Sequence, residues 1–372
     1  MIRFNKPYIS GKEIEYINEV IASGRLAGGN DFTKLCENFL EKFNGSEKVL
    51  LTHSCTAALE MSAILMDVKK GDEIIMPSYT FVSTANAFVL RGAVPVFVDI
   101  DKKNFCIDDQ KIKNAITDKT VGIVPVHYGG LSANMDNISK IAKDFNLFVI
   151  EDAAQSLGCK YNEKNLGTIG ALSTLSFHET KNLNCGEGGA LCINDTSLIE
   201  RAEIIREKGT NRSKFFRGHI DKYTWVDIGS SYIPSELNAA FLYAQLNNLD
   251  KAFTSRKSIW NLYKERLEPI NSFSIPESFL SGIHNCHIFP ILTENLDERT
   301  NLLEFLASRN IGAVFHYVPL HNTVAGIKYG KASEDLSVTN DLSERLIRLP
   351  IYSDMEQKDA EVVIESIIEF YA

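Results

Sequence analysis

Two charged residues, Lys181 and Asp152, each follow a short apolar run. Lys181 comes just after the run Leu172–Phe177, which predicts a strand, and it lies in a turn rich in small residues. Asp152 comes shortly after a second apolar run, Leu147–Ile150, which predicts another strand. A lysine beyond a strand end can reach a bound cofactor and lose its proton when it is desolvated.

A lysine and an aspartate placed in this way are the two protein groups that pyridoxal 5′-phosphate (PLP) needs. The lysine forms a Schiff base with the cofactor, and the aspartate pairs with its pyridinium nitrogen. Either residue alone would more often be a solvated surface charge or a helix cap. Their occurrence together favours a PLP site with Lys181 and Asp152 as its catalytic residues.

A turn of small residues after the first predicted strand could bind a phosphate. The segment Thr52–Leu59 reads as a strand end, a turn that contains Cys55 and Thr56, and the start of a helix. Free N–H groups and hydroxyls at a helix N-terminus form a phosphate cradle. An ordinary Ser/Thr cap is the alternative interpretation. The phosphate is favoured because the turn belongs to the same sheet edge as Asp152 and Lys181.

The elements that must position these residues alternate between short apolar runs and helical patterns. Such alternation predicts an α/β fold, with a mainly parallel seven-stranded sheet flanked by helices. Ligands of such sheets bind at the carboxyl ends of the strands. The predicted strands are 49–52, 73–76, 94–100, 121–126, 147–151, 172–177 and 190–193, and the predicted helices between them are 56–67, 80–90, 109–116 and 134–145.

The pattern changes after the last of these strands. One long helix is predicted over 234–267, followed by amphipathic helices at 297–308 and 353–370 and short strands near 287–292 and 312–318. We therefore expect a large domain at 1–245 and a smaller C-terminal α+β domain at 246–372.

The segment Arg206–Arg217 contains five cations and one acid in an otherwise acidic protein. It could be a solvated loop, or it could hold a diphosphate, which arginine and lysine suit by charge and geometry. Arg212 and Lys214 are the candidates for substrate contacts within it.

Composition excludes several classes of partner. A net charge of −9 and a pI near 5.5 argue against nucleic acid or an anionic membrane surface. No apolar stretch approaches the ~20 residues of a membrane span, and the first residues lack the apolar core of a signal peptide.

The seven cysteines form no C-x-x-C pair, which favours reduced thiols in a cytoplasmic protein. No metal site is expected.

The lysine segment resembles that of the DegT/DnrJ group of PLP-dependent nucleotide-sugar aminotransferases, which have the type I, aspartate aminotransferase-like fold. The motif of that family looks like Ser-Phe-x-x-x-Lys-x-Leu with Gly-Gly shortly after, and it is matched by Ser176, Phe177, Lys181, Leu183, Gly188 and Gly189. The similarity extends over essentially the whole chain, from Ser23-Gly24 through Pro77–Phe81 to Pro319–His321.

The resemblance implies roles for individual residues. It makes Lys181 the Schiff-base lysine and Asp152 the pyridinium partner. It implies cofactor contacts for Cys55, Thr56, Phe81, Gln155 and Ser176, and sugar contacts for Glu187 and His321. Ser231 stands where many members have an asparagine that reaches the cofactor phosphate of the partner subunit. The resemblance therefore implies a homodimer with shared active sites.

Within the family, several segments look like the enzymes that move an amino group from L-glutamate to C4 of TDP-4-keto-6-deoxy-D-glucose. That reaction gives TDP-4-amino-4,6-dideoxy-D-galactose for cell-envelope polysaccharides. The equatorial 4-amino product and amination at C3 stay open. A sugar dehydratase of this fold is disfavoured because a histidine replaces the lysine in those relatives. A non-catalytic binding protein is disfavoured because Lys181 and Asp152 are both present.

Overall fold

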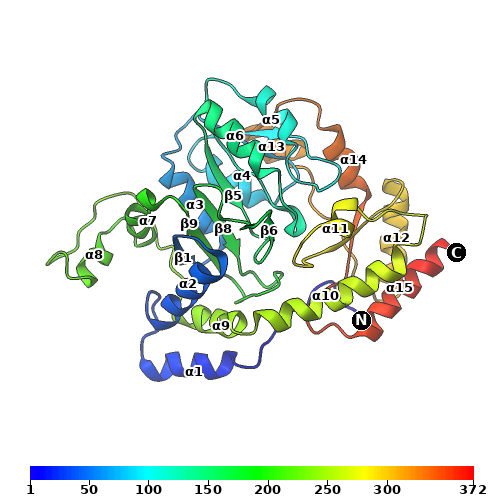
Figure 1. Ribbon diagram of the computed structural model, residues 1–372, viewed down its shortest axis with the longest axis horizontal. Helices are drawn as coiled ribbons and strands as arrows, with labels where there is room; N and C mark the ends of the chain where they lie inside the picture. Colours follow the sequence, from blue (N-terminus) through cyan, green and yellow to red (C-terminus); the bar gives the residue numbers. More distant parts are fainter.

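The computed structural model describes residues 1–372 and is built around a sheet of eight strands (Figure 1). The strand order is β1-β9-β8-β5-β4-β2-β3-β11. Strand β9 is antiparallel to both neighbours, and all other neighbouring pairs are parallel. The strands are β1 (Lys48–Thr52), β2 (Glu73–Pro77), β3 (Val94–Val98), β4 (Thr120–Ile123), β5 (Phe148–Asp152), β8 (Leu172–Ser176), β9 (Gly189–Ile193) and β11 (Lys331–Ala332). All seven predicted strands are present.

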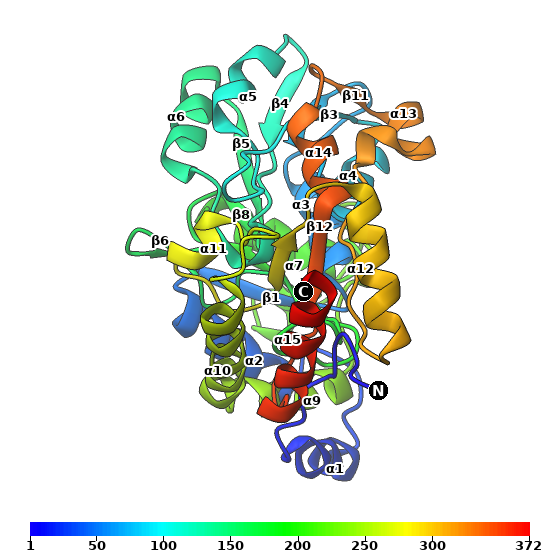
Figure 2. The same ribbon diagram turned by 90° about the vertical axis from the view of Figure 1, so that its right-hand side faces the viewer.

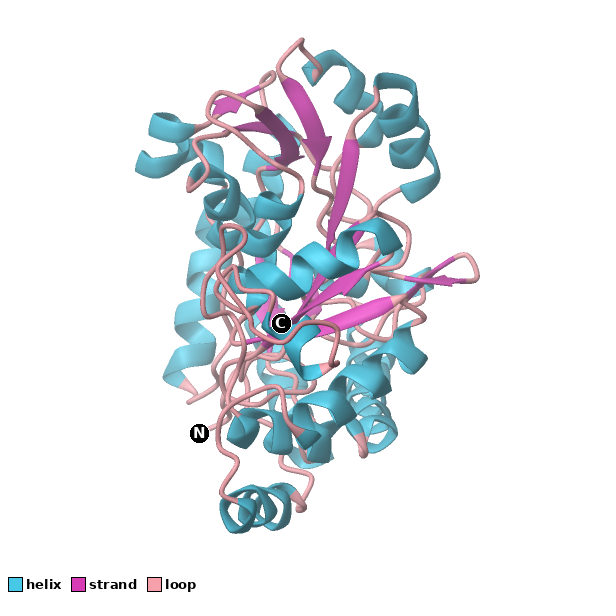
Figure 3. Cartoon of the chain, turned by 90° about the vertical axis from the view of Figure 1, so that its left-hand side faces the viewer, coloured by secondary structure: helices cyan, strands magenta, loops and turns pink.

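Helices cover both faces of the sheet (Figure 3). Successive residues of a strand point to opposite faces, so apolar strands that are buried on both sides feed two cores. In β1, for example, Leu50 packs in the core with α3, and Val49 packs in the core with α2 and α9. The helices of the first face are α3 (Cys55–Leu65), α4 (Val82–Val89) and α7 (Ile199–Arg206), and those of the second are α2 (Asp31–Asn44), α5 (Asp109–Ala115), α6 (Met135–Phe145) and α9 (Glu236–Leu246).

The C-terminal part of the chain adds a second, smaller sheet and its helices (Figure 2). Strands β10 (Phe289–Leu292) and β12 (Leu346–Leu349) pair antiparallel. Helices α10 and α15 lie side by side (Figure 1). The Tyr263 ring of α10 contacts the Phe289 ring of β10. The helices are α10 (Leu249–Leu267), α11 (Glu277–Ser281), α12 (Leu296–Ser308), α14 (Ser337–Arg345) and α15 (Gln357–Tyr371).

The remaining elements are short or peripheral. Helix α8 stands away from the rest of the molecule, at the left of Figure 1. None of the helices combines the length and the apolar composition that a membrane span requires. These elements are α1 (Glu13–Ser23), α8 (Arg212–Phe216), α13 (Val324–Tyr329), the hairpin of β6 (Lys160–Tyr161) and β7 (Lys164–Asn165), and three 3₁₀ turns at Tyr128–Gly130, Thr196–Leu198 and Leu320–Asn322.

The single helix predicted over 234–267 is wrong, because the structure has two helices there. Helix α9 ends at Leu246 and α10 begins at Leu249. The two residues between them are asparagines, which compete with helical hydrogen bonding through their side chains. The Asn248 side-chain amide donates to the Ala244 carbonyl at 3.0 Å. The helical spacing of apolar residues continues across the two asparagines, so the sequence pattern did not reveal the break.

The strand predicted over 312–318 is also wrong. Only Val314 pairs with a neighbour, as an isolated antiparallel bridge to Arg348 of β12. The residues that follow, Phe315 to Tyr317, leave the edge of the small sheet and line a cavity instead. The partner that β10 needs is β12, which the sequence pattern did not reveal.

The sheet has eight strands and not seven, because the C-terminal part returns to it. The two residues of β11 pair with β3, and the Lys331 ammonium lies 2.6 Å from a carboxylate oxygen of Glu73. Two exposed residues carry no periodic signal, so the sequence could not predict this strand. The expected division into 1–245 and 246–372 lies beside the break between α9 and α10 and stays a prediction.

Candidate active site

A cavity of about 760 Å³ opens at the carboxyl ends of the parallel strands. Its walls come from the ends of β5 and β8, the N-terminus of α3, and the segment 314–317 of the C-terminal part. The structure brings together eight of the predicted site residues there: Cys55, Thr56, Phe81, Asp152, Gln155, Ser176, Lys181 and Glu187.

Lys181 enters the cavity from a tight turn after β8. Its backbone N–H donates to the carbonyl of His178 at 2.9 Å, which closes the turn. Desolvation lowers the pKa of the Lys181 ammonium, and the nearby Cys55 and Asp152 oppose that shift only in part. The neutral amine is therefore more accessible here than on the protein surface.

Asp152 ends β5, and its carboxylate is held from two sides. The Thr84 hydroxyl donates to Oδ2 at 2.7 Å, and the Ala154 N–H donates to Oδ1 at 3.2 Å. The Thr80 hydroxyl, just before α4, lies 2.8 Å from that of Thr84 in the helix. The buried carboxylate is thus held in the wall of the cavity.

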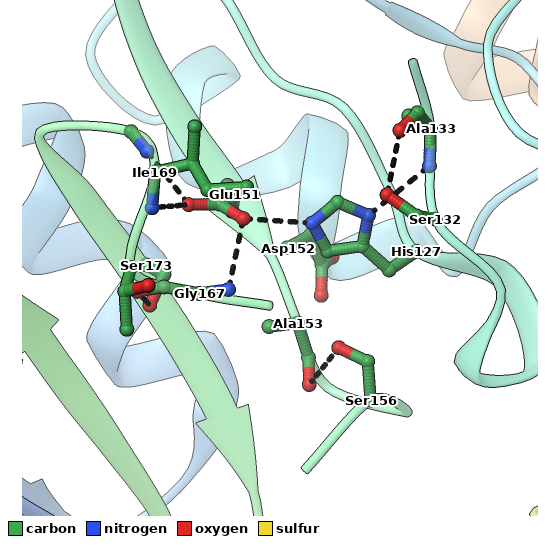
Figure 4. Close-up of polar contacts among 12 residues, drawn as sticks. His127, Ser132, Ala133, Glu151, Asp152, Ala153, Ser156, Gly167, Ile169 and Ser173 are labelled. Atoms are coloured by element: carbon green, nitrogen blue, oxygen red, sulfur yellow. Dashed lines mark hydrogen bonds and ion pairs between the residues drawn. The ribbon is translucent and has the colours of Figure 1, made fainter. Parts of the chain in front are cut away.

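The preceding residue, Glu151, points away from the cavity into a closed network (Figure 4). It accepts hydrogen bonds from His127 Nε2 at 2.9 Å and from the backbone N–H groups of Gly167, Ile169 and Gly170 at 2.7–2.8 Å. Burial alone would raise the pKa of Glu151, but these donors together lower it. Glu151 therefore anchors the strand end, and its neighbour is the carboxylate that faces the cavity.

The turn between β1 and α3 forms a cradle beside these residues. Ser54 caps α3 by accepting from the Ala57 N–H at 3.1 Å. Gly189, the first residue of β9, lies against this turn, and a Cβ at that position would come within 2.3 Å of the Cys55 nitrogen. Only glycine allows this approach, which explains why Gly189 follows the lysine turn. Burial raises the pKa of the Cys55 thiol to about 12, so Cys55 stays protonated.

Gln155, which follows β5, and Tyr317, from the C-terminal part, add to the cavity wall. Gln155 accepts from the Gly129 N–H at 2.7 Å, and its amide donates to the Tyr317 hydroxyl at 2.6 Å. Thr84, Tyr317 and Arg348 also line this cavity and were not predicted from the sequence. Thr84 could have been found, because it lies four residues after Thr80 in a predicted helix. The other two come from distant parts of the chain and carry no local signal.

Four predicted site residues do not line the cavity of this chain. His321 is held elsewhere, with Nδ1 2.7 Å from the Ser78 hydroxyl. Ser231 is exposed and pairs through its backbone with Glu207. Arg212 and Lys214 belong to α8 and form ion pairs with Glu207 and Glu200 at 3.6 Å and 2.6 Å.

Comparison with known proteins gives the family. A model of the DegT/DnrJ/EryC1/StrS aminotransferase family matches residues 7–368, and the chain belongs to this family. GDP-perosamine synthase of Escherichia coli O157:H7 is 30% identical over 368 residues, 99% of this chain and 98% of that protein. The aminotransferase TlmJ of Streptoalloteichus hindustanus has a TM-score of 0.91 and 27% identity, and the match covers 100% of this chain and 99% of that one. The protein is therefore a PLP-dependent sugar aminotransferase with the type I fold.

The cavity fits PLP. A related structure, NtdA of Bacillus subtilis, contains the aminated cofactor pyridoxamine phosphate, with a TM-score of 0.87, 27% identity and coverage of 97% of this chain and 82% of that one. In this chain the glycine-backed turn at Cys55 is shaped for a phosphate. The fixed carboxylate of Asp152 and the desolvated amine of Lys181 suit the ring nitrogen and the aldehyde carbon.

Proposed function

We propose that the enzyme moves the amino group of L-glutamate to C4 of TDP-4-keto-6-deoxy-D-glucose, giving TDP-4-amino-4,6-dideoxy-D-galactose for cell-envelope polysaccharide. The observation that carries the proposal is that the Lys181 amine, the Asp152 carboxylate and the Cys55 turn meet in one large cavity. GDP-perosamine synthase, whose name describes a nucleotide-linked product, supports a nucleotide sugar as substrate.

The side chains divide the chemistry between them. PLP, when bound, supplies a carbon that carries the amino group and a ring that withdraws electrons. We propose that Lys181 Nζ holds the cofactor at rest. When freed, the Lys181 amine would move a proton between the donor Cα and the carbon that carries the amino group. Asp152 would hold the proton on the ring nitrogen, and Thr84 orients that carboxylate. Phe81, at the N-terminus of α4, lines the same cavity and would contact the ring.

The product identifies the reaction. With TDP-4-keto-6-deoxy-D-glucose and L-glutamate, we expect an amine at C4 in the axial position. NMR of the purified product should then show small couplings between H4 and both neighbouring protons. Large couplings would indicate the equatorial epimer, and an amine at C3 would contradict the proposed regiochemistry. The GDP-linked 4-keto-6-deoxy sugar is the matched comparison, and its faster amination would show that the nucleotide is wrong.

We also propose a homodimer in which Ser231, Arg212 and Lys214 complete the partner's site. Three observations support it. These residues are outside the cavity of their own chain, and α8 projects away from the rest of the molecule. The side chains of Phe216 in α8 and Trp225 after it are 69% and 79% exposed. A stable interface of this kind would bury ~2,000 Å² or more. Analytical ultracentrifugation should show a dimer at micromolar concentration, and a fully active monomer would contradict it.

A further inference from the structure

A buried histidine, His287, shares the cavity wall with Lys181. It lies two residues before β10, and its side chain is 8% exposed. Both residues also line a second, smaller cavity of about 20 Å³, to which Asn182 and Asn285 contribute but which they do not share with the main cavity. Lys181 and His287 are therefore neighbours in the partition between the two cavities.

The hydrogen bonds around His287 determine which ring nitrogen carries the proton. The Asn182 amide nitrogen donates to the Asn285 carbonyl at 2.9 Å, so the Asn182 amide oxygen faces the ring. This oxygen lies 2.9 Å from His287 Nδ1 and can only accept, so Nδ1 carries the hydrogen. In the neutral ring Nε2 is then an acceptor, and no protein group donates to it.

The backbone around His287 holds the ring in place before any ligand binds. The buried guanidinium of Arg256 donates to the carbonyls of Cys286 and His287 at 3.0 Å and 2.6 Å. The His287 N–H donates to the Asn285 side-chain oxygen at 3.2 Å. The direction of the Nε2 lone pair is therefore set by the fold.

The surroundings of His287 keep its ring neutral. Desolvation lowers the pKa of His287 well below its usual value, and the positive charges of Lys181, Arg256 and Arg348 lower it further. His316, the other buried histidine that lines the cavity, also has a lowered pKa because of burial and these cations. Nε2 of His287 therefore remains an acceptor and does not take up a proton itself.

From this geometry we infer that His287 Nε2 accepts a hydrogen bond from the Lys181 amine when that amine is free of the cofactor, directly or through one water that the smaller cavity can hold. The inference rests on the proposed role of Lys181 in proton transfer and names the residue that holds the amine between transfers. His287 is a positioning residue, and the proton stays on Lys181.

This hydrogen bond has an electrostatic consequence. Burial and the charge of Arg348 lower the pKa of Lys181, whereas Cys55 and Asp152 oppose that shift. An acceptor at His287 Nε2 stabilises the ammonium that forms when Lys181 takes a proton, so it also raises the pKa. Removing the acceptor should therefore make Lys181 a weaker base.

Competitive acetylation of Lys181 tests this without turnover and without the sugar. In the enzyme loaded with pyridoxamine phosphate, Lys181 is not bonded to the cofactor. The pH dependence of its labelling by acetic anhydride, followed by mass spectrometry, then gives its pKa. In His287→Asn the pKa should fall by about 1 to 2 units, the equivalent of the ~10- to 150-fold loss of a hydrogen bond to a charged group. The asparagine amide can still donate to Asn182, so this variant removes only the acceptor.

Three further variants separate the possible causes. His287→Gln brings an amide oxygen to the region of Nε2 and should keep most of the wild-type pKa. His284→Asn is the matched control, because His284 lies outside the cavity and is bonded to the Phe279 carbonyl at 3.0 Å. It should leave the pKa of Lys181 unchanged. His287→Leu also lacks the acceptor and serves if His287→Asn folds poorly by thermal melting.

Two results would overturn the inference. The first is an unchanged Lys181 pKa in His287→Asn. The second is an equal fall in His287→Asn and His287→Gln, which would show that packing of the ring, and not its acceptor, sets the pKa. The proposed function fails in a different way: equal labelling of Lys181 in the enzyme loaded with PLP and with pyridoxamine phosphate would show that Lys181 does not hold the cofactor.

Discussion

Lys181→Ala should abolish transamination. Loss of one proton-transferring group alone costs about 10²–10⁴-fold in rate, and the variant also loses the covalent anchor for the cofactor. The cavity would still bind PLP, because the Cys55 turn and Asp152 remain. Turnover with L-glutamate and the keto sugar, together with the absorbance spectrum of the purified variant, measures both effects.

Lys164→Ala, in the exposed β6–β7 hairpin, is the control and should retain full turnover. Near wild-type turnover in Lys181→Ala would refute the assignment of Lys181. A variant that loses both turnover and all affinity for PLP would show instead that the anchor holds the cofactor almost alone.

Asp152→Asn should lower turnover by about 10²-fold or more, on the scale of losing one charged catalytic contact, while cofactor content falls little. The substitution keeps the shape and the Thr84 contact but removes the charge that keeps the ring nitrogen protonated. Single-turnover absorbance with L-glutamate measures the loss in the first half-reaction.

Thr84→Val is the informative comparison for Asp152. It removes the 2.7 Å hydrogen bond but leaves the charge, so its effect should be smaller than that of Asp152→Asn. Unchanged turnover in Asp152→Asn would make Asp152 a structural cap of the segment after β5. Equal losses in both variants would show that orientation, and not charge, is what matters.

The local part of the site could be predicted from the sequence, and the reason is physical. Parallel strands bring their carboxyl ends to one edge, so residues after β1, β5 and β8 had to meet once the strands were recognised. Alternation along β5 could not by itself show which of Glu151 and Asp152 faces the cavity. In the structure the Glu151 carboxylate accepts four hydrogen bonds from the protein, so Asp152 is the residue that faces the cavity.

The rest of the site depends on long-range packing that no local pattern encodes. Tyr317 meets Gln155 across 162 residues of sequence. Arg348 reaches the cavity because β12 pairs with β10 in a second sheet. Of these two strands, only β10 was predicted from the sequence. Arg212, predicted from the basic segment, and Ser231, placed by resemblance, lie outside the cavity of their own chain, so their predicted roles depend on a second subunit.

Strand β11 has a consequence for how the chain reaches its native state. Until residues 331–332 have left the ribosome, the outer edge of β3 has no partner, although β3 itself is made more than 200 residues earlier. An open strand edge can pair with another chain, and contacts so distant in sequence form slowly. The nascent protein is therefore exposed to edge-to-edge association throughout most of its synthesis. The pairing of Lys331 with Glu73 ends that exposure only when about nine-tenths of the chain has been made.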